Sequence, residues 1–338
     1  MDIVTQGLLG GTLALSVAKK SESRHAVAVG CVAALLADVD VLISSPGDTL
    51  VNLEFHRHFT HSLVFIPLGA LIAALLLWPL LRRRLEFRRL YLYALLGYAT
   101  SGLLDACTSY GTHLLWPFSD VRIAWSIIAI IDPLFTLILL VAVLWGMKNY
   151  RPRPARIGLG LAGVYLLFGA WQHHNALQVA TQLAQQRGHS AERLIVKPTM
   201  ANLLLWRSIY EADGVFYVDA VRLGQLVPDR VYPGRSARRF EVARDRSDIP
   251  PNTVLARDID RFSRLSNGFV IDDPARDNVL IDIRYSMLPT SLKPLWGIDL
   301  NVATPAEHPR FTIYRDRPAN LRQTFLAMLL GRDLPASP

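Results

Sequence analysis

The chain has 338 residues, of which 51% are hydrophobic and only 19% are charged, and its mean hydropathy of +0.25 is high for a soluble protein. This composition excludes collagen-like, disulfide-scaffold and intrinsically disordered chains. The first half contains apolar stretches of the length that spans a bilayer, about 20 residues, so a single soluble globule is excluded as well. The second half, residues 176–338, holds 40 of the 64 charged residues, which indicates a domain surrounded by water.

The formal net charge of +8 has the sign of a nucleic-acid-binding protein. In the first half, however, the basic residues form short clusters between apolar segments, which is typical of the loops of a membrane protein. Both cysteines, Cys31 and Cys107, lie in apolar surroundings, so they indicate nothing about the redox compartment of the polar half.

Residues 1–175 are predicted to form an α-helical integral membrane bundle. The segment 3–18 is short for a full span, and the basic residues that follow it favour an uncleaved first helix over a secretory signal. Five further apolar segments are predicted as spans, at residues 26–44, 62–81, 90–108, 123–147 and 157–175. The sequence therefore predicts about five to six spans.

Basic loops indicate the orientation, because cytoplasmic loops carry the excess of Lys and Arg. Such clusters occur after the first, third and fifth segments, at Lys19, Lys20 and Arg24, at Arg82–Arg84 with Arg88 and Arg89, and at Lys148, Arg151, Arg153 and Arg156. We therefore expect a multi-pass protein of the bacterial inner membrane, with its C-terminal half on the periplasmic or extracellular side.

Residues 176–189 are predicted to form a helical linker, and residues 190–338 a small, mainly β extramembrane domain. Short alternating runs predict strands at residues 215–221, 278–283 and 311–314. Turns are predicted at Pro233-Gly234, Asn267-Gly268 and Asp272-Asp273-Pro274, and a closing helix at residues 319–330.

Ionisable residues inside spans are costly and mark functional sites. In the predicted topology they gather at the outer ends of the spans, as Asp2, Asp38, Asp40, His56, His58, His61, Asp105 and Asp132. Imidazole nitrogen mixed with carboxylate oxygen suits Zn, Mn or Fe. The alternatives are interfacial histidines, a solvated helix end at Asp38 and Asp40, and a helix-start carboxylate at Asp132 that pairs with Arg57 or Arg122. Helical spacing places His58 and His61 on one face, whereas His56 and His61 can meet only if the chain bends.

Five motifs carry a family resemblance. They are Met1-Asp2-x-x-Thr5-x-Gly7-x-x-Gly10, Leu36-x-Asp38-x-Asp40, His56-Arg57-x-x-Thr60-His61-Ser62, Asp105-x-x-Thr108-x-Tyr110-Gly111 followed by Trp116-Pro117-Phe118, and Asp132-Pro133-Leu134-Phe135. In order and spacing they resemble the membrane-bound metal-dependent hydrolases, the YdjM-type inner-membrane proteins. The segment Pro198-x-x-x-Asn202-x-x-x-Trp206-Arg207 resembles the longer members of that family.

The resemblance implies a metal-dependent hydrolase whose ligands are Asp38, Asp40, His56, His61 and Asp105. It places His58 at a variable position. Many relatives have His where Gln6 stands and some have His where Ser101 stands, so a site for two ions is less secure than a site for one. The expected cofactor is one or two divalent ions, with Zn and Mn the best fits.

A metal-bound water becomes a nucleophile near neutral pH, and one residue must stay off the metal as a base. Asp132 and Asp40 are the candidates for this base, and Arg57 is expected to hold a developing anion. Thr60 and Thr108 are expected to orient ligands, and Asp2 and Gln6 to lie beside them. A site at the outer headgroup level predicts contact with membrane lipid and an amphiphilic or lipid-linked ester or phosphoester substrate.

Two other classes remain open. Intramembrane Asp and His also line the paths of ion or metal transporters, although those place polar groups near the midplane. A metal-stabilised membrane scaffold without catalysis would have a closed coordination shell. Nucleic acid is not an expected partner, because the site faces outward and no recognition motif occurs.

Overall fold

The computed structural model describes residues 1–224, 228–314 and 320–334. Its contacts divide the chain into two units. We call them the helical unit, which comprises Met1–Ile43, Phe55–Gln172 and Met200–Leu203, and the C-terminal unit, which comprises Ser44–Glu54, His173–Thr199 and Leu204–Pro338. A short segment of the N-terminal half thus folds with the C-terminal half. The boundaries predicted after residues 175 and 189 follow chain order alone and stay predictions.

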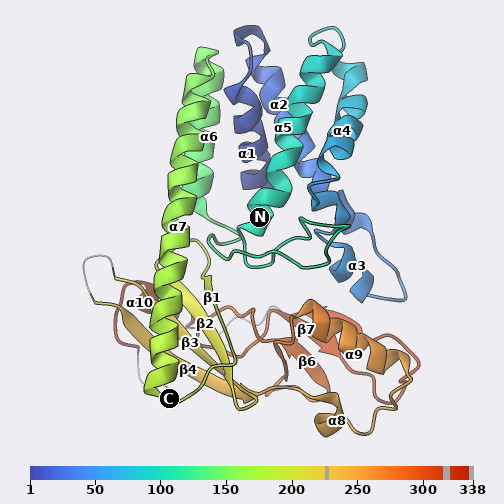
Figure 1. The fold of residues 1–338 in the computed structure, drawn as a ribbon, viewed down its shortest axis with the longest axis vertical. Helices are drawn as coiled ribbons and strands as arrows, with labels where there is room; N and C mark the ends of the chain where they lie inside the picture. Colours follow the sequence, from blue (N-terminus) through green and yellow to red (C-terminus); the bar gives the residue numbers. More distant parts are fainter. Residues whose placement is uncertain (225–227, 315–319, 335–338) are drawn as a thin grey trace. The chain divides into compact units, whose positions relative to one another are not determined.

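The helical unit is built from apolar helices that run side by side (Figure 1). They are α1 (Ile3–Ser16), α2 (Ser23–Leu36), α4 (Ile66–Leu81), α5 (Phe87–Ala106), α6 (Pro133–Asn149) and the part of α7 (Arg153–Gln186) up to Gln172, with 3-10 turns at Lys20–Glu22 (η1), Ala37–Leu42 (η2) and Phe59–His61 (η3). Two of them begin at a capping carboxylate. Asp2 accepts from the backbone amides of Val4 and Thr5, and Asp132 accepts from that of Phe135, which satisfies otherwise unpaired helix-start donors.

Glycine allows three of these helices to touch through their backbones. A Cβ on Gly30 of α2 would lie 2.4 Å from the carbonyl oxygen of Gly10 on α1, and a Cβ on Gly97 of α5 would lie 2.3 Å from the carbonyl oxygen of Gly30. Small residues let helices in membranes approach in this way and gain van der Waals contact. The positions of α1, α2 and α5 relative to one another therefore depend on these glycines.

Two helical stretches are long and apolar enough to cross a membrane, at Lys20–Leu42 and Arg153–Gln186. A third is added only if the broken helical stretch between residues 50 and 81 counts as one span, while α1 and α6 are shorter. The predicted count of five to six spans is therefore not supported by helix length and composition. What holds is a helical N-terminal region with two candidate spans.

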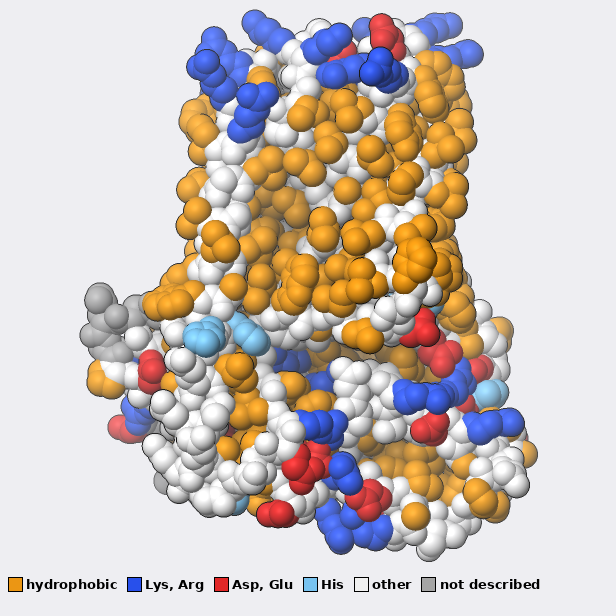
Figure 2. All heavy atoms as spheres, viewed as in Figure 1, with side chains coloured by type: hydrophobic (Ala, Val, Ile, Leu, Met, Phe, Trp, Pro, Cys, Tyr) orange, Lys and Arg blue, Asp and Glu red, His pale blue; other side chains and the backbone are white. Residues whose placement is uncertain are grey.

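The surface of the helical unit separates apolar from basic side chains. Hydrophobic side chains cover the sides of its helices, and Lys and Arg gather at one end (Figure 2). At that end lie the connections α1–α2, α4–α5 and α6–α7, and the three basic clusters of the sequence lie in these connections and in the helix ends beside them. The ends of the helices that carry Asp2, Asp38, Asp105 and Asp132 are the opposite ones.

The predicted span 123–147 begins too early, because α6 starts only at Pro133. The preceding residues form an extended strap whose amides bond to other backbone groups. The amide of Trp125 donates to the Ala106 carbonyl (2.7 Å), and that of Ile127 to the Cys107 carbonyl (2.9 Å). The strap is as apolar as a helix, so its hydropathy conceals its conformation. Asp132 and Pro133 are a typical helix start.

The C-terminal unit contains two four-stranded antiparallel sheets, which confirms the predicted mainly β character. The first has the order β1-β2-β3-β4 and the second β5-β6-β7-β8. The strands are β1 (Arg193–Pro198), β2 (Leu205–Ala212), β3 (Val215–Arg222), β4 (Arg230–Arg238), β5 (Val270–Asp272), β6 (Val279–Asp282), β7 (Trp296–Asp299) and β8 (Arg310–Ile313), and the helices are α3 (Leu50–Phe55, at the border of the two units), α8 (Val242–Asp245), α9 (Val254–Leu265) and α10 (Leu321–Leu329). Ile209 and Phe216 of the first sheet share a hydrophobic core with Ile271 and Ile281 of the second.

The three predicted strands are confirmed as β3, β6 and β8, and turns occur at Asn267-Gly268 and after Asp272. The predicted turn at Pro233-Gly234 is wrong. Both residues lie inside β4, an edge strand, where proline is tolerated and where the pairing with β3 shifts register. The predicted closing helix corresponds to α10, although Ala319 lies outside the described residues.

Replacing Gly30 with Ala is expected to destabilise the helical unit. The new methyl group would meet the backbone of α1, so the helices must separate, at a cost of about 1–3 kcal/mol. Gly160→Ala on α7 is the matched control, because open space surrounds a Cβ there. Thermal unfolding in detergent should show a lower Tm for Gly30→Ala only, and equal Tm values in both variants would contradict the packing described.

Candidate metal centre

The first two carboxylates of the site lie on a 3-10 helix. Asp38 and Asp40 belong to η2, which continues α2. Their environments differ, because the Asp38 side chain is 22% exposed whereas that of Asp40 is fully buried. The 3-10 helix η2 is wound more tightly than an α-helix, and its two carboxylates approach His61 from different sides.

A backbone bend at Arg57 separates His56 from the histidines that follow. Arg57 has a positive φ of 60°, which is uncommon for a residue with a side chain. After this bend, His58–His61 enter the 3-10 turn η3, and His61 is buried. The sequence indicated that His56 and His61 can meet only if the chain bends, and this bend is present. The ring of His58 instead lies tilted against that of His113, with ring centroids 4.6 Å apart.

Three predicted ligands converge on one point. Nε2 of His61 lies 3.2 Å from Oδ1 of Asp38 and 3.3 Å from Oδ2 of Asp105, a fully buried residue near the end of α5. One ligand atom from each of the three residues lies within 4.8 Å of the others. We call this group the Asp38–His61–Asp105 triad.

The donor atoms of the triad fit a divalent cation. His61 Nε2 and Asp105 Oδ2 are buried and have no hydrogen-bond partner in the described part of the chain. Buried polar atoms without partners are costly, and an ion between them would satisfy both. Two carboxylates and one imidazole match the preferences of Zn and Mn, and three protein ligands leave coordination positions open, as in catalytic sites.

Asp40 and His56 lie on the other side of His61 from the triad. Nδ1 of His61 is 3.3 Å from Asp40 Oδ2 and 3.0 Å from the Thr60 hydroxyl. Asp40 also accepts from the Arg57 amide (2.8 Å) and from Thr60 (2.7 Å), and it lies 3.2 Å from His56 Nδ1. A carboxylate on the far nitrogen fixes the ring orientation of a metal-binding histidine. The geometry therefore gives Asp40 an orienting position.

Two cationic groups approach the second oxygen of Asp105. The Met1 ammonium donates to Oδ1, and Arg57 Nη2 lies 3.2 Å from the same atom. Arg57 also donates to the Thr108 hydroxyl at 3.3 Å, and Thr108 donates to the Asp105 carbonyl at 2.7 Å. Thus Arg57 and Thr108, both predicted, lie directly beside the triad.

Two predicted site residues have other contacts. Asp132 is fully buried, but it caps α6 and accepts from the Tyr165 hydroxyl at 2.7 Å. Asp2 caps α1 and accepts from the Thr5 hydroxyl at 2.6 Å. The structure does not bring either residue into the triad, and the helix-start interpretation of Asp132 matches its contacts.

Gln6 and Ser101, where the resemblance expects histidines, meet at a single backbone atom. Both donate to the Ala34 carbonyl, at 3.2 and 2.6 Å. In this chain the two positions thus form a hydrogen-bonded link from α1 and α5 to α2. The amide oxygen of Gln6 is buried and has no hydrogen-bond partner in the described part of the chain.

The aromatic ring of Tyr110 is the site feature that sequence analysis missed. The guanidinium groups of Arg57 and Arg122 lie 5.3 and 4.7 Å from its centroid. Tyr110 belongs to the same motif as Asp105 and Thr108, and its place in that motif could have indicated a role in the site. The convergence of both arginines on it depends on the strap before α6, which hydropathy misassigned.

A second group of possible ligands, Asp48, Asp258 and His308, lies in the C-terminal unit. Nη1 of Arg261 donates to Asp48 at 2.8 Å and to Asp258 at 2.6 Å. His308 Nδ1 lies 2.6 Å from Asp258. Because a guanidinium already occupies the space between the carboxylates, this group is a charged network rather than an ion site.

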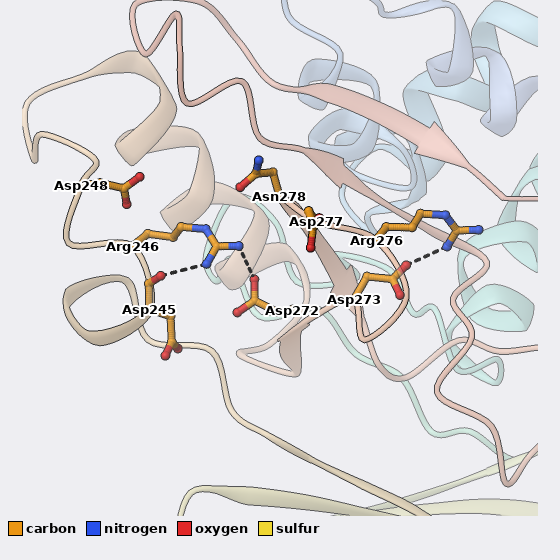
Figure 3. Close-up of a pocket in the computed structure, with 8 residues that line it drawn as sticks. All are labelled: Asp245, Arg246, Asp248, Asp272, Asp273, Arg276, Asp277 and Asn278. Carbon is orange, nitrogen blue, oxygen red and sulfur yellow. Dashed lines mark hydrogen bonds and ion pairs between the residues drawn. The ribbon is translucent and has the colours of Figure 1, made fainter.

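A pocket of about 510 Å³ also lies in the C-terminal unit (Figure 3). Its lining consists of Asp245, Arg246, Asp248, Asp272, Asp273, Arg276, Asp277 and Asn278. Arg246 pairs with Asp272 and Arg276 with Asp273, each at 2.7 Å. Burial raises the pKa of Asp272 above its ordinary value. The facing carboxylates are therefore partly neutralised by arginines.

Comparison with known proteins supports the resemblance carried by the five motifs. The YdjM inner membrane protein family matches residues 1–176, more than half of the chain and all of the triad. The chain belongs to this family. Membership in the YdjM family supports a location in the bacterial inner membrane.

Two relatives extend this comparison. YfhP of Bacillus subtilis (strain 168), described as an uncharacterized protein, is 27% identical over 224 residues, which cover 65% of this chain and 66% of YfhP. The inner membrane protein YbcI of Escherichia coli (strain K12) is 31% identical over 134 residues, which cover 38% of this chain and 75% of YbcI. The chain thus spans slightly less than two thirds of YfhP. No solved structure matches this YdjM family protein.

Gly102→Ala is expected to weaken metal binding without removing a ligand. A Cβ at Gly102 on α5 would lie 2.3 Å from the His61 carbonyl oxygen, so the His61 turn must shift away from Asp105. Displacing a ligand through its support costs about 10- to 100-fold in metal affinity. Titration of purified protein with Zn²⁺ measures this loss. Gly163→Ala, in open space on α7, is the control, and equal affinities in the two variants would argue against the triad.

Proposed function

We propose that this YdjM family protein is a membrane-embedded metal-dependent hydrolase that binds one divalent cation, Zn or Mn, at the Asp38–His61–Asp105 triad. The observation that carries the proposal is the convergence of His61 Nε2 and Asp105 Oδ2, two buried atoms 3.3 Å apart without hydrogen-bond partners in the described chain. Such a cation supplies Lewis acidity and lowers the pKa of a bound water.

The neighbouring side chains have distinct tasks in this proposal. Asp40 and Thr60 hold the Nδ1 side of His61, so that Nε2 points into the triad. Arg57, fixed by Asp105 and Thr108, stabilises negative charge that develops on the substrate.

The base is better assigned to His56 than to Asp132 or Asp40. Both oxygens of Asp132 already accept hydrogen bonds, and Asp40 is surrounded by donors. His56 has a side chain that is 28% exposed, with Nδ1 3.2 Å from Asp40. This leaves Nε2 able to accept a proton while the carboxylate orients the ring.

We further propose that all six apolar helices lie in the inner membrane, that the triad lies at the outer headgroup level, and that the C-terminal unit is periplasmic. Support comes from the three basic connections at one end of the helical unit and from the exposed apolar side chains along it, such as Leu76, Leu80 and Leu167. A site at that level would act on an amphiphilic or lipid-linked ester or phosphoester.

A transporter or a metal-stabilised scaffold would use the same residue types. Transport needs polar groups along a path through the membrane. Residues 62–81 contain no charged residue, and α6 contains none before Lys148. A scaffold would close the coordination shell, whereas three protein ligands leave it open. Both observations favour hydrolysis.

Metal content is the first test of this function. Detergent-purified wild-type protein, reconstituted with Zn²⁺ or Mn²⁺, is expected to hold about one ion per chain by elemental analysis, as the single triad implies. His61→Ala and Asp105→Asn should lose it, because each removes a donor. His25→Ala, at the other end of α2 from Asp38, should retain it. Full metal content in His61→Ala would exclude the triad as the site.

The orientation is tested by cysteine labelling in intact cells. With Cys31 and Cys107 replaced by serine, Ser247→Cys in the C-terminal unit should react with a membrane-impermeant maleimide, because both the residue and its proposed compartment are accessible. Arg83→Cys, exposed in the basic α4–α5 connection, should react only after permeabilisation. The reverse pattern would place the C-terminal unit in the cytoplasm.

A further inference from the structure

Two guanidinium groups lie near the ring of Tyr110, and one of them, that of Arg57, also contacts the triad. Arg57 lies 5.3 Å and Arg122 4.7 Å from the ring centroid, and the His56 ring lies 5.6 Å away. Cation–π attraction accounts for one arginine on the ring. A second arginine adds repulsion between like charges, which is unfavourable unless negative charge is nearby.

Only one of the two arginines forms an ion pair with a carboxylate in the described chain. Arg57 pairs with Asp105 at 3.2 Å. Arg122 donates through Nη2 to the His56 carbonyl at 3.3 Å, and in the described chain it makes no ion pair with a carboxylate. Arg122 Nη1 is buried without a hydrogen-bond partner among those residues, and so is Arg57 Nε. Arg122 is half-buried, so its charge is incompletely hydrated.

Some arginines of the C-terminal unit are matched by a carboxylate. Arg187 forms two hydrogen bonds with Asp219, at 2.7 and 2.8 Å. Arg284 likewise contacts Asp282 at 2.6 Å. Arg122 has no such carboxylate among the described residues, and its Nη1 is unused beside Tyr110, the ring that Arg57 of the site also contacts. Guanidinium groups match phosphate oxygens in both charge and geometry.

We propose that Arg122, Arg57 and Tyr110 form a phosphate-binding subsite, which makes the substrate of the proposed hydrolase a phosphoester rather than a carboxylic ester. The inference rests on the proposed function for the reaction, but not for binding of the anion. In the reaction, the oxygen of water bonds to phosphorus and the ester P–O bond breaks. The leaving oxygen takes up the proton that His56 accepted from water.

Binding of phosphate to the full-length protein in detergent tests the subsite. Inorganic phosphate is measured by equilibrium dialysis, and phosphatidic acid in mixed micelles by competition against it, each with metal-free and metal-loaded protein. Arg122→Gln should weaken binding roughly 10- to 100-fold, the value of one or two charged hydrogen bonds, with metal content unchanged. Arg122→Lys, which keeps the charge but loses the planar fork, should fall between it and wild type.

Arg24→Gln is the matched control, because Arg24, in the first turn of α2, lies 5.4 Å from the Tyr150 ring at the basic end of the helical unit and should leave phosphate binding unchanged. The tighter of the two ligands identifies the source of the phosphate, a lipid headgroup or a soluble ester. Weaker binding of either ligand in Arg122→Gln supports the subsite, even if the wild type holds no metal and the hydrolase proposal fails. Wild-type affinity for both ligands in Arg122→Gln and Arg122→Lys, at normal metal content, overturns the subsite and leaves the metal centre standing.

Discussion

The buried contact between His61 and Asp105 is the interaction on which the site in the helical unit depends. Their nearest atoms are 3.3 Å apart, and neither has a hydrogen-bond partner among the described residues. Burying a carboxylate is costly unless cationic charge offsets it. Here Arg57 and the Met1 ammonium contact one oxygen of Asp105, and the other oxygen faces His61 Nε2. Close packing at Gly30 and Gly102 keeps this arrangement at a fixed distance.

Successive helices of the helical unit run in opposite directions, and this arrangement places acidic residues at the starts of α1 and α6 and a basic residue at the end of α6. The α1, α4 and α6 helices start at the end that carries the triad and finish at the basic end. Carboxylates are favourable at helix starts and basic side chains at helix ends, because of the helix dipole. Asp2 and Asp132 cap two of the starts, and Lys148 lies in the last turn of α6. The basic residues at that end therefore also stabilise the end of α6.

Apolar runs predicted the helices because a helix of this type needs little beyond length and hydrophobicity. They failed at residues 123–132, where the same composition forms a strap held by backbone hydrogen bonds. Asp38, His61 and Asp105 were predicted as ligands together with Asp40 and His56. The sequence did not predict that Asp40 and His56 lie on the opposite side of the His61 ring. That arrangement depends on which imidazole nitrogen faces which carboxylate, and thus on the bend at Arg57 and the 3-10 turns. The spacing of residues along a sequence does not show which way a side-chain ring is turned.

The segment between the ligand-bearing turns has a role that chain order conceals. Ser44–Glu54 connects Asp40 to His56 but folds with the C-terminal unit. Arg261 binds Glu54 at 2.8 and 2.9 Å and Asp48 at 2.8 Å, and Leu50 is fully buried in a core with Phe262. A loop that is held in place loses less entropy when its ends are brought together than a free loop does. Folding of the C-terminal unit therefore lowers the entropic cost of placing Asp38 and Asp40 against His61. This gives the C-terminal unit a structural reason to accompany the Asp38–His61–Asp105 triad, whose residues all lie in the helical unit.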